Sequence, residues 1–326
     1  MTGSKFGTAQ STSFEEIPVI DISTIQTAEG FERIAEKLVH TAKTVGFFYI
    51  TGHGISEKLI EQVFATSKRF FKLPVAKKST VAVDKNQRGW MGQGMAQLEG
   101  SKTHDSKEVF FWGWDVDASD PDVLAGVPMV FPNQWPDEVA PFVRRDLTPY
   151  YEAIMSLGRS ILSALAFGLG KSPDFFAKAY ENPLGRGQMV YYPPMSKEDE
   201  EQERFGAAAH TDFGILTVLL QDMQGGLQVL NQSNEWIEAP PLEGSLVCNI
   251  GDLLECWTNG DLISTKHRVI NRNKTARYSI PVFCDPASKT VIDPEDFSND
   301  IEGYEKITAG EHIANRNRKN FAQYQN

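Results

Sequence analysis

The sequence predicts a mainly β protein with flanking helices, built around a β sandwich or jelly roll. After Gly185 the chain becomes a series of short β-rich runs with no helical pattern between them. Before Gly185 it carries amphipathic helical patterns, and after Asp300 it ends in a basic segment that is typical of a helix. A parallel sheet is disfavoured, because each of its crossovers needs about a dozen residues, usually a helix.

The first half of the chain supplies the first two predicted helices. IPVIDIS, over residues 17–23, is typical of a short strand, and the apolar residues that follow recur at helical spacing. These residues are Phe31, Ile34, Ala35, Leu38 and Ala42. Gly46 ends this helix before a compact buried strand over 47–50, and Ser56 can cap the second helix.

A third helix and the β-rich runs complete the pattern. The helix is expected over 136–169, broken or bent at Pro149, because proline lacks the backbone donor. Among the strands, Asn259-Gly260 is a strong signal for a β-hairpin. We expect one domain over residues 1–326. Its parts are a disordered leader (1–15), a helical N-terminal region (16–184), a jelly-roll core (185–300) and a C-terminal helix (301–326).

Composition limits the partners. The chain is 41% hydrophobic and 23% charged, so it can bury a sizeable core, and its formal net charge is -11. An acidic surface repels phosphate backbones and anionic lipid, so neither nucleic acid nor a membrane is an expected partner. Its three cysteines, Cys248, Cys256 and Cys284, form no CxxC pair and indicate reduced thiols. We therefore expect a cytoplasmic protein, with a monomer favoured.

His210-Thr211-Asp212 is the first candidate metal motif. In a strand, residues two apart point to the same face, so this spacing directs an imidazole and a carboxylate into one space. Nitrogen and oxygen ligands together suit Fe(II), Mn(II) or Zn(II). Such a short motif also arises by chance, so alone it is a weak signal.

His267 is the candidate third ligand. It lies in a strand-like run, STKHRV, and strands far apart in sequence lie side by side in a jelly roll. Two histidines and one carboxylate leave half of the coordination sphere open, as an Fe(II) oxygenase requires for its co-substrate and O2. A structural zinc site would instead be closed by four protein ligands.

Arg277 and Ser279 form a candidate carboxylate receptor. They share one strand face by the same alternation, and a guanidinium with a nearby hydroxyl suits a carboxylate. The alternative is an ordinary surface arginine, which is the usual fate of this residue type. The apolar neighbours Ile280, Val282 and Phe283 favour the receptor.

Four runs of the second half resemble the isopenicillin N synthase-like branch of the 2-oxoglutarate and Fe(II)-dependent dioxygenases. They are HTDFGILTVLLQD, GGLQV, NIGDLLECWTNGDLISTKHRVIN and RYSIPVFCDP. The runs IPVIDIS, GFFYITGHGI, FFKLP and DSKEVFFWG are similar to the N-terminal region of that family. The resemblance covers residues 17–313, and it implies a double-stranded β-helix core.

The resemblance also implies the cofactors and their ligands. Fe(II) would be bound by His210, Asp212 and His267, and the far carboxylate of 2-oxoglutarate by Arg277 and Ser279. Tyr192 would add a hydroxyl to the 2-oxoglutarate site, although Val190 stands where plant members commonly have Asn. With O2, such an enzyme oxidises a small molecule by hydroxylation, desaturation or cyclisation, and releases succinate and CO2. This activity would fit secondary metabolism.

The substrate site is less defined. Phe283 aligns with a position that often lines the substrate pocket in this family, and plain core packing is its alternative. Residues 88–114 form an irregular, partly apolar stretch that could act as a lid. Within it, Arg88, Trp90 and Gln93 are candidate substrate contacts, which would suit a mid-sized, partly apolar molecule.

Two other functions stay open at this point. One is an oxidase of the same fold that uses its arginine and serine for the carboxylate of the main substrate and needs no 2-oxoglutarate. The other is a non-catalytic binding or sensing protein, which the intact set of three metal ligands disfavours.

Overall fold

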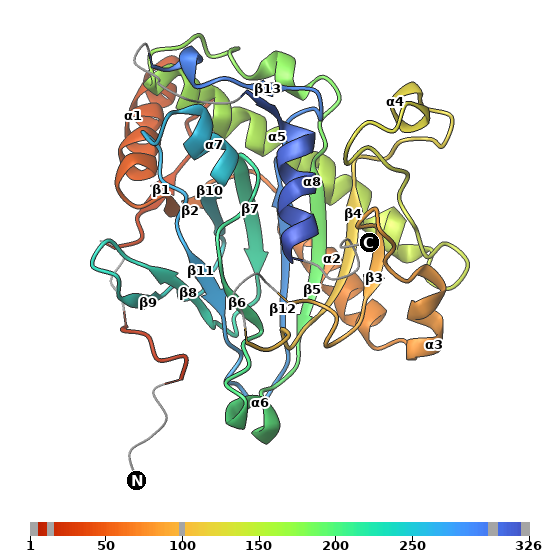
Figure 1. The fold of residues 1–326 in the computed structure, drawn as a ribbon. Coiled ribbons are helices and arrows are strands. Elements are labelled where there is room, and N and C mark those ends of the chain that lie inside the picture. Colours follow the sequence, from red (N-terminus) through yellow and green to blue (C-terminus); the bar gives the residue numbers. More distant parts are fainter. Residues whose placement is uncertain (1–5, 12–15, 98–101, 299–305, 321–326) are drawn as a thin grey trace.

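Two β-sheets form the centre of the computed structural model, which describes residues 6–11, 16–97, 102–298 and 306–320 (Figure 1). The larger sheet has the strand order β1-β2-β10-β7-β12-β5-β4-β3, and the smaller sheet has the order β6-β11-β8-β9. The bounds of the strands are β1 (Val19–Asp21), β2 (Phe47–Thr51), β3 (Gly89–Met91), β4 (Glu108–Gly113), β5 (Arg186–Tyr192), β6 (Ala207–His210), β7 (Leu216–Gln221), β8 (Leu227–Leu230), β9 (Trp236–Glu238), β10 (Leu246–Ile250), β11 (His267–Val269), β12 (Arg277–Phe283), β13 (Val291–Ile292) and β14 (Ile307–Thr308).

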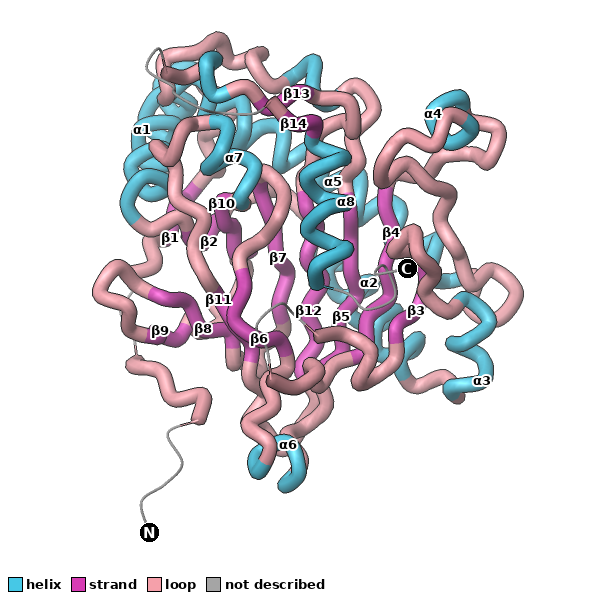
Figure 2. The backbone as a smooth tube through the Cα atoms, viewed as in Figure 1, coloured by secondary structure: helices cyan, strands magenta, loops and turns pink. Residues whose placement is uncertain are grey.

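α1, α2 and α5 cover the face of the larger sheet that is turned away from the smaller one (Figure 2). The bounds of the α-helices are α1 (Ala28–Thr44), α2 (Glu57–Phe71), α3 (Val75–Lys78), α4 (Pro121–Leu124), α5 (Phe142–Gly168), α6 (Lys197–Glu201), α7 (Asp252–Trp257) and α8 (Ala309–Asn320). Ser56 caps α2 as predicted, and its side chain accepts a hydrogen bond from the Leu59 amide. The jelly-roll core with flanking helices is thus the architecture that the sequence predicts.

The alternation of β12 separates the two sides of the larger sheet. Ile280 and Val282 pack among the helices, where the Tyr150 hydroxyl of α5 donates to the Ile280 carbonyl at 3.0 Å. Arg277 and Ser279 point the other way, into the space between the sheets. Helix packing on one face therefore fixes which side chains reach the interior on the other.

Pro149 and Asn259-Gly260 do not interrupt or connect the chain in the way that their sequence predicts. α5 continues through Pro149 without a break, because only one intrahelical donor is lost while the helix stays packed against α1 and α2. Asn259-Gly260 does not join two strands. Both residues have positive φ, and Gly260 donates to the Glu255 carbonyl, so the pair ends α7.

The predicted leader is not uniformly disordered. Residues 1–5 and 12–15 lie outside the described part of the chain, whereas 6–11 lie against the smaller sheet. Gln10 donates from its amide to the Trp236 carbonyl at 2.8 Å, and Phe6 is buried. The prediction of disorder is therefore wrong for residues 6–11, because they extend a sheet edge and bury an aromatic ring.

The predicted lid over residues 88–114 contains two strands of the larger sheet. β3 and β4 pair antiparallel, and β4 also pairs with β5 along its whole length. These strands are held by ladder hydrogen bonds on the sheet, so the lid interpretation is wrong for them. Residues 98–101 lie outside the described part of the chain.

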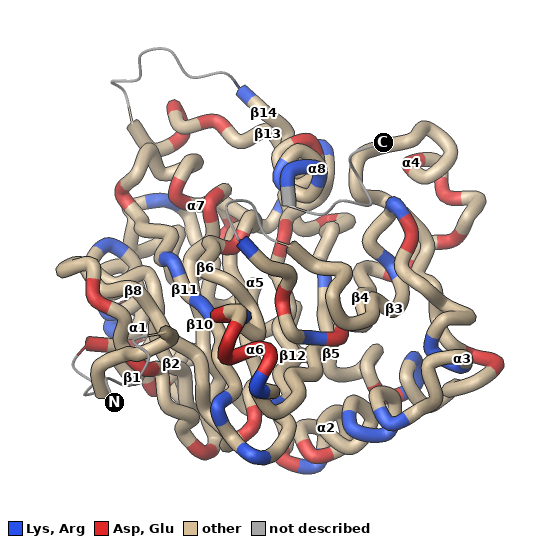
Figure 3. The backbone as a smooth tube through the Cα atoms, turned by 60° about the horizontal axis from the view of Figure 1, so that its bottom comes forward, with Lys and Arg blue, Asp and Glu red and all other residues tan. Residues whose placement is uncertain are grey.

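Charge is spread over many elements, with acidic residues concentrated on α6 and residues of both signs along α2 (Figure 3). The helices of the described residues include none that is long and apolar enough to cross a membrane.

Candidate metal centre

The candidate metal ligands lie on paired strands of the smaller sheet. His210 is the last residue of β6 and His267 is the first of β11, and the antiparallel register places them directly opposite each other. Asp212 follows His210 by two residues and faces the same space. Phe47 of β2 packs against the His267 ring with 5.3 Å between centroids, which restricts the orientation of that imidazole.

The ligand atoms are close enough to share one ion. Asp212 Oδ1 lies 3.9 Å from His210 Nε2 and 3.8 Å from His267 Nε2. All three ligand atoms lie within 4.8 Å of one another, and within the described residues this is the group of metal-ligating side chains that the fold brings together. The three ligands predicted from sequence are therefore assembled at one point.

Hydrogen bonds orient both imidazoles. His210 Nδ1 lies 2.7 Å from the Ala208 carbonyl, and His267 Nδ1 lies 3.2 Å from the Thr265 carbonyl. A proton on Nδ1 donates to the carbonyl and leaves the Nε2 lone pair for a metal. Burial, and then the neighbouring His267, lower the pKa of His210 to about 3, so this imidazole is neutral at neutral pH.

Asp212 presents one oxygen to the site and engages the other. Oδ2 accepts hydrogen bonds from Thr217 Oγ1 at 2.6 Å and Asn249 Nδ2 at 2.8 Å, and Oδ1 faces the histidines. Burial alone would raise the pKa of this carboxyl, but the two histidines and these hydrogen bonds hold the pKa below its usual value. Sequence reasoning missed Thr217 and Asn249, because both lie on other strands.

Close backbone packing fixes the turn that carries Asp212. A Cβ atom on Gly251 would lie 2.3 Å from the Gly214 carbonyl oxygen, and one on Gly214 would lie 1.7 Å from Asp285 Oδ1. A side chain at Gly251 would displace this turn, and one at Gly214 would displace the buried Asp285 carboxylate. The two glycines therefore let the strand ends approach the loop that follows β6 and carries Asp212 (the ligand loop).

The predicted carboxylate receptor is buried and faces the space between the sheets. Arg277 is 0% exposed, its Nε donates to the Gly225 carbonyl at 2.8 Å, and its Nη2 donates to Gln221 Oε1 at 3.0 Å. Arg277 Nη1 is also buried but finds no hydrogen-bond partner among the described residues. Burying an unpaired cationic donor is costly, so this nitrogen points to a ligand that is anionic.

Tyr192 and Ser279 adjoin this arginine as predicted. Tyr192 is opposite Arg277 in the β5–β12 register, and its ring centroid lies 4.9 Å from the guanidinium carbon. Ser279 shares the inward face of β12 and pairs with Val190, which is buried and apolar. Val190 therefore offers no side-chain hydrogen bond to a ligand.

A second cation, which sequence reasoning missed, lies on the same side of the sheet. Lys107 directly precedes β4, and its ammonium lies 2.9 Å from Asp105 Oδ2. Burial disfavours the charge, yet Asp105 and Tyr192 raise the pKa of Lys107 above its usual value. This lysine was visible within the DSKEVFFWG run.

Phe283 lies at the end of β12 that is nearest the ligand loop. It pairs in register with Thr217, which bonds Asp212, and with Arg186. The Arg186 guanidinium carbon lies 4.9 Å from the Phe283 ring centroid, and Arg186 Nε donates to Asp285 Oδ2 at 2.7 Å. This buried ion pair beside Phe283 carried no recognisable sequence signal.

The three predicted contacts from the 88–114 stretch have different locations. Arg88 is buried against Gly113, which pairs with Arg186, so it lies near Phe283. Trp90 packs on the helix side of the sheet and donates to Glu108 Oε2 at 2.9 Å. Alternation along β3 turns Trp90 away from the metal, so its predicted substrate contact is wrong. Gln93 is exposed.

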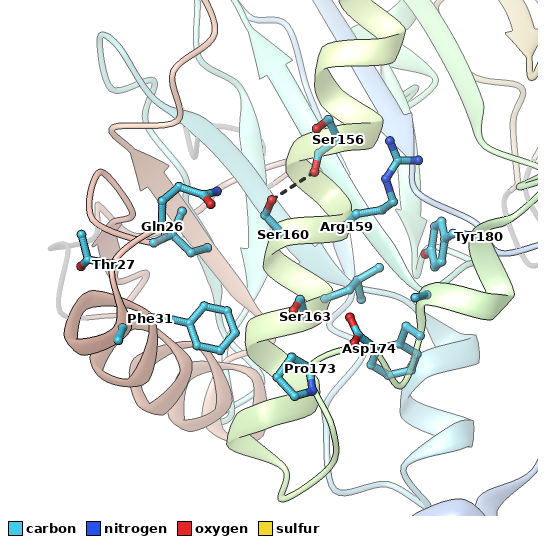
Figure 4. Close-up of a pocket in the computed structure, with 15 residues that line it drawn as sticks. Gln26, Thr27, Phe31, Ser156, Arg159, Ser160, Ser163, Pro173, Asp174 and Tyr180 are labelled. Carbon is cyan, nitrogen blue, oxygen red and sulfur yellow. Dashed lines mark hydrogen bonds between the residues drawn. The ribbon is translucent and has the colours of Figure 1, made fainter.

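A cavity of about 670 Å³ on the helical side is separate from this centre (Figure 4). It lies between α1 and α5, and its lining includes Phe31, Arg159, Ser160, Asp174 and Tyr180. None of the three metal-ligand candidates lines it. We therefore do not assign this cavity as the catalytic site, although it is large.

Two family models match the chain. Residues 17–138 match the N-terminal domain described as "non-haem dioxygenase in morphine synthesis", and residues 187–286 match the 2OG-Fe(II) oxygenase superfamily. A 2-oxoglutarate-Fe(II) type oxidoreductase of Emericella nidulans is 36% identical over 275 residues, with 82% of this chain and 78% of that protein covered. A homoarginine-6-hydroxylase of Oryza sativa is 32% identical over 326 residues, with 94% and 98% covered.

A solved structure has the same fold. A Neurospora crassa protein, crystallised in complex with alpha-KG and thymine, superposes with a TM-score of 0.80 at 29% identity, covering 92% of this chain and 96% of that one. The chain belongs to the 2OG-Fe(II) oxygenase superfamily, in its isopenicillin N synthase-like branch. It is a non-haem oxygenase that uses Fe(II), 2-oxoglutarate and O2 and acts on small molecules.

Proposed function

We propose that His210, Asp212 and His267 bind the iron, and that Arg277, with Ser279 and Tyr192, binds the far carboxylate of 2-oxoglutarate. The buried Arg277 Nη1 without a partner among the described residues carries the second assignment. A carboxylate complements a guanidinium through charge-assisted hydrogen bonds and removes the cost of the unpaired donor.

The residues of the chain orient this chemistry. Bound iron supplies the activation of O2 that couples conversion of 2-oxoglutarate to succinate and CO2 with oxidation of the substrate. Thr217 and Asn249 hold one oxygen of Asp212, so the other is presented to the metal in a fixed direction. Val190, Phe47 and their buried neighbours keep water from the space between the sheets.

We propose that the substrate lies beside Phe283 and Arg186. The ring offers an apolar surface, and the Arg186–Asp285 pair offers a buried donor and acceptor next to it. Arg88 adds a further cation near this place. These groups suit a small molecule with an apolar part and a polar or anionic group, and hydroxylation is the reaction that we propose for it.

A metabolite screen tests this assignment. The protein would be incubated with Fe(II), 2-oxoglutarate, O2 and a panel that includes homoarginine and thymine, which the names of its relatives suggest. A product heavier by one oxygen, with matching succinate, supports hydroxylation, whereas loss of two hydrogens indicates desaturation or cyclisation. Arg186→Met and Phe283→Ala should raise KM for the active compound and leave 2-oxoglutarate affinity unchanged. Wild-type KM in both variants would place the substrate elsewhere.

We further propose one dioxygenase domain over the whole chain, acting as a monomer in the cytoplasm. β1 to β4 of the N-terminal region pair within the same sheet as β5, β7, β10 and β12, which supports a single domain. Cys248, Cys256 and Cys284 are free thiols, which supports a reducing compartment.

A further inference from the structure

Asp252 lies at a junction of three segments that are far apart in sequence. It is the first residue of α7, and Gly251 separates it from the buried strand β10. Its Oδ2 accepts from Thr211 Oγ1 at 3.1 Å, and its Oδ1 accepts from Ser264 Oγ at 2.8 Å. Its backbone amide donates to the Asp212 carbonyl at 2.7 Å.

These contacts connect both segments that carry the candidate ligands. Thr211 stands between His210 and Asp212, and Ser264 precedes His267 by three residues. One carboxylate therefore holds the ligand loop and the approach to β11 in a fixed relation. Hydrogen-bonded groups behind metal ligands commonly set the orientation and affinity of a site.

Arg316 adds α8 to the same junction. Its Nη2 lies 2.9 Å from Asp252 Oδ2 and donates to Thr211 Oγ1 at 3.3 Å. Its guanidinium carbon also lies 4.6 Å from the ring centroid of Phe213, the residue after Asp212. Arg316 thus contacts the residue on each side of Asp212.

The next residue of α8, Asn317, reaches the N-terminal region. Asn317 Nδ2 donates to Gln87 Oε1 at 3.1 Å, and Gln87 Nε2 donates back to Asn317 Oδ1 at 3.3 Å. Both residues are buried, and Gln87 precedes Arg88. α8 therefore spans from the ligand loop to the segment that leads into β3, in front of the larger sheet (Figure 1).

We infer that Asp252 and Arg316 are positioning residues that couple the docking of α8 to the geometry of the iron site. The inference rests on the proposed iron ligands His210, Asp212 and His267. If α8 docks only when the ligand loop has the metal-binding geometry, iron must favour docking and docking must favour iron by the same factor. α8 then contributes to the geometry and the Fe(II) affinity of the metal centre.

Fe(II) affinity and proteolysis of α8 test the coupling in the full chain. We expect Arg316→Gln and Asp252→Asn each to weaken Fe(II) binding, measured without O2, by about 10-fold, within the usual range of coupling between sites. Fe(II) should slow proteolytic cleavage of α8 in the wild type but not in Arg316→Gln. Arg316→Lys keeps the charge without the planar fork, so it should restore part of both effects.

Arg318→Gln is the matched control, because Arg318 lies on the same helix and is exposed. It should keep wild-type Fe(II) affinity and Fe(II)-dependent protection. The double variant Arg316→Gln/Asp252→Asn should lose less affinity than the product of the two single losses, because one interaction cannot be removed twice.

Wild-type Fe(II) affinity in Arg316→Gln, or α8 protection by Fe(II) that this variant retains, would overturn the coupling. Asp212→Ala separates this failure from failure of the proposed function. If Asp212→Ala abolishes Fe(II) binding while Arg316→Gln binds normally, the ligands are right and the coupling is wrong. If Asp212→Ala binds Fe(II) like the wild type, the ligand assignment itself fails and the coupling fails with it.

Discussion

Single hydrogen bonds decide which atom of each proposed ligand is free for the metal. The carbonyls of Ala208 and Thr265 take the Nδ1 side of the two imidazoles, and Thr217 with Asn249 takes one oxygen of Asp212. The spacing of HxD predicted that these side chains share a space. The two carbonyls are local, each two residues before its histidine, but Thr217 and Asn249 could not be predicted because β7 and β10 come near only in the folded topology.

Replacing Asp212 tests the ligand assignment at this scale. We expect Asp212→Ala to abolish Fe(II) binding and turnover and to leave the fold intact, because the strands keep their ladders. Asp212→Glu should also be severely impaired, since one added methylene displaces the carboxylate. His53→Ala is the control. His53 Nδ1 accepts a hydrogen bond from the Ile55 amide at 3.1 Å in a turn. Loss of the His53 side chain should therefore leave the Fe(II) affinity, measured by titration, unchanged.

Replacing Arg277 tests the 2-oxoglutarate site. Loss of one partner of a buried charge pair costs about 2–5 kcal/mol, so Arg277→Ala should weaken 2-oxoglutarate binding by about 30-fold or more. Arg277→Lys should rescue only part of this loss, because an ammonium cannot form the planar fork. Isothermal titration of the Fe(II)-loaded protein measures both. Unchanged 2-oxoglutarate affinity in Arg277→Ala would remove this residue from the site.

At the scale of elements, regular patterns were predicted well and irregular ones were not. α1, α2 and most strands after Gly185 form where the pattern places them, whereas Lys197–Glu201 and Asp252–Trp257 in the β-rich region form α6 and α7. β3 and β4 lie in a stretch of glycine, tryptophan and charged residues whose pairing with β5 is set by tertiary contacts. Asn259-Gly260 fits a hairpin and a helix end equally well, because both require positive φ.

The contact between α2 and α5 gives a stability prediction. Asp146 of α5 accepts from Thr66 Oγ1 at 2.5 Å and from Gln62 Nε2 at 2.7 Å, both on α2. Asp146→Ala leaves the buried Thr66 hydroxyl without this partner, so it should lower the free energy of unfolding by about 1–3 kcal/mol in urea titrations. Asp137→Ala is the control, because Asp137 is exposed and its carboxylate lies 3.4 Å from the exposed Arg144 guanidinium. An equal loss of unfolding free energy in both variants would contradict a stabilising role of the Asp146 hydrogen bonds.

The stabilisation that these Asp146 hydrogen bonds provide should depend on pH. Burial would raise the pKa of Asp146, but the hydrogen bonds from Arg145, Thr66 and Gln62 hold the folded-state pKa below its usual value. A carboxyl with a depressed folded pKa stabilises the protein above its unfolded pKa of about 3.9, and this contribution is lost as pH falls through the folded pKa. The stability gap between wild type and Asp146→Ala should therefore be full at pH 6 and shrink in acid. A gap that grows in acid would contradict this sign.

At the scale of the whole molecule, strands from both halves of the sequence build one sheet, and the smaller sheet closes over its inner face. This closure brings the HxD motif and His267 together, and it leaves Arg277 facing the space between the sheets. The family resemblance implied this assembly, whereas composition and periodicity alone reached only a sandwich or jelly roll. The proposed substrate site was least predictable, because Arg186, Asp285 and Arg88 come near one another only through packing.

The requirement for 2-oxoglutarate tests the account most directly. Succinate would be measured from wild-type protein supplied with Fe(II), O2 and a compound that it oxidises, with and without 2-oxoglutarate. We predict that oxidation needs 2-oxoglutarate and yields matching succinate, that Asp212→Ala abolishes both, and that Arg277→Ala recovers them only at high 2-oxoglutarate concentration. Full oxidation of that compound with O2 and a reductant, but without any 2-oxo acid, would contradict the account.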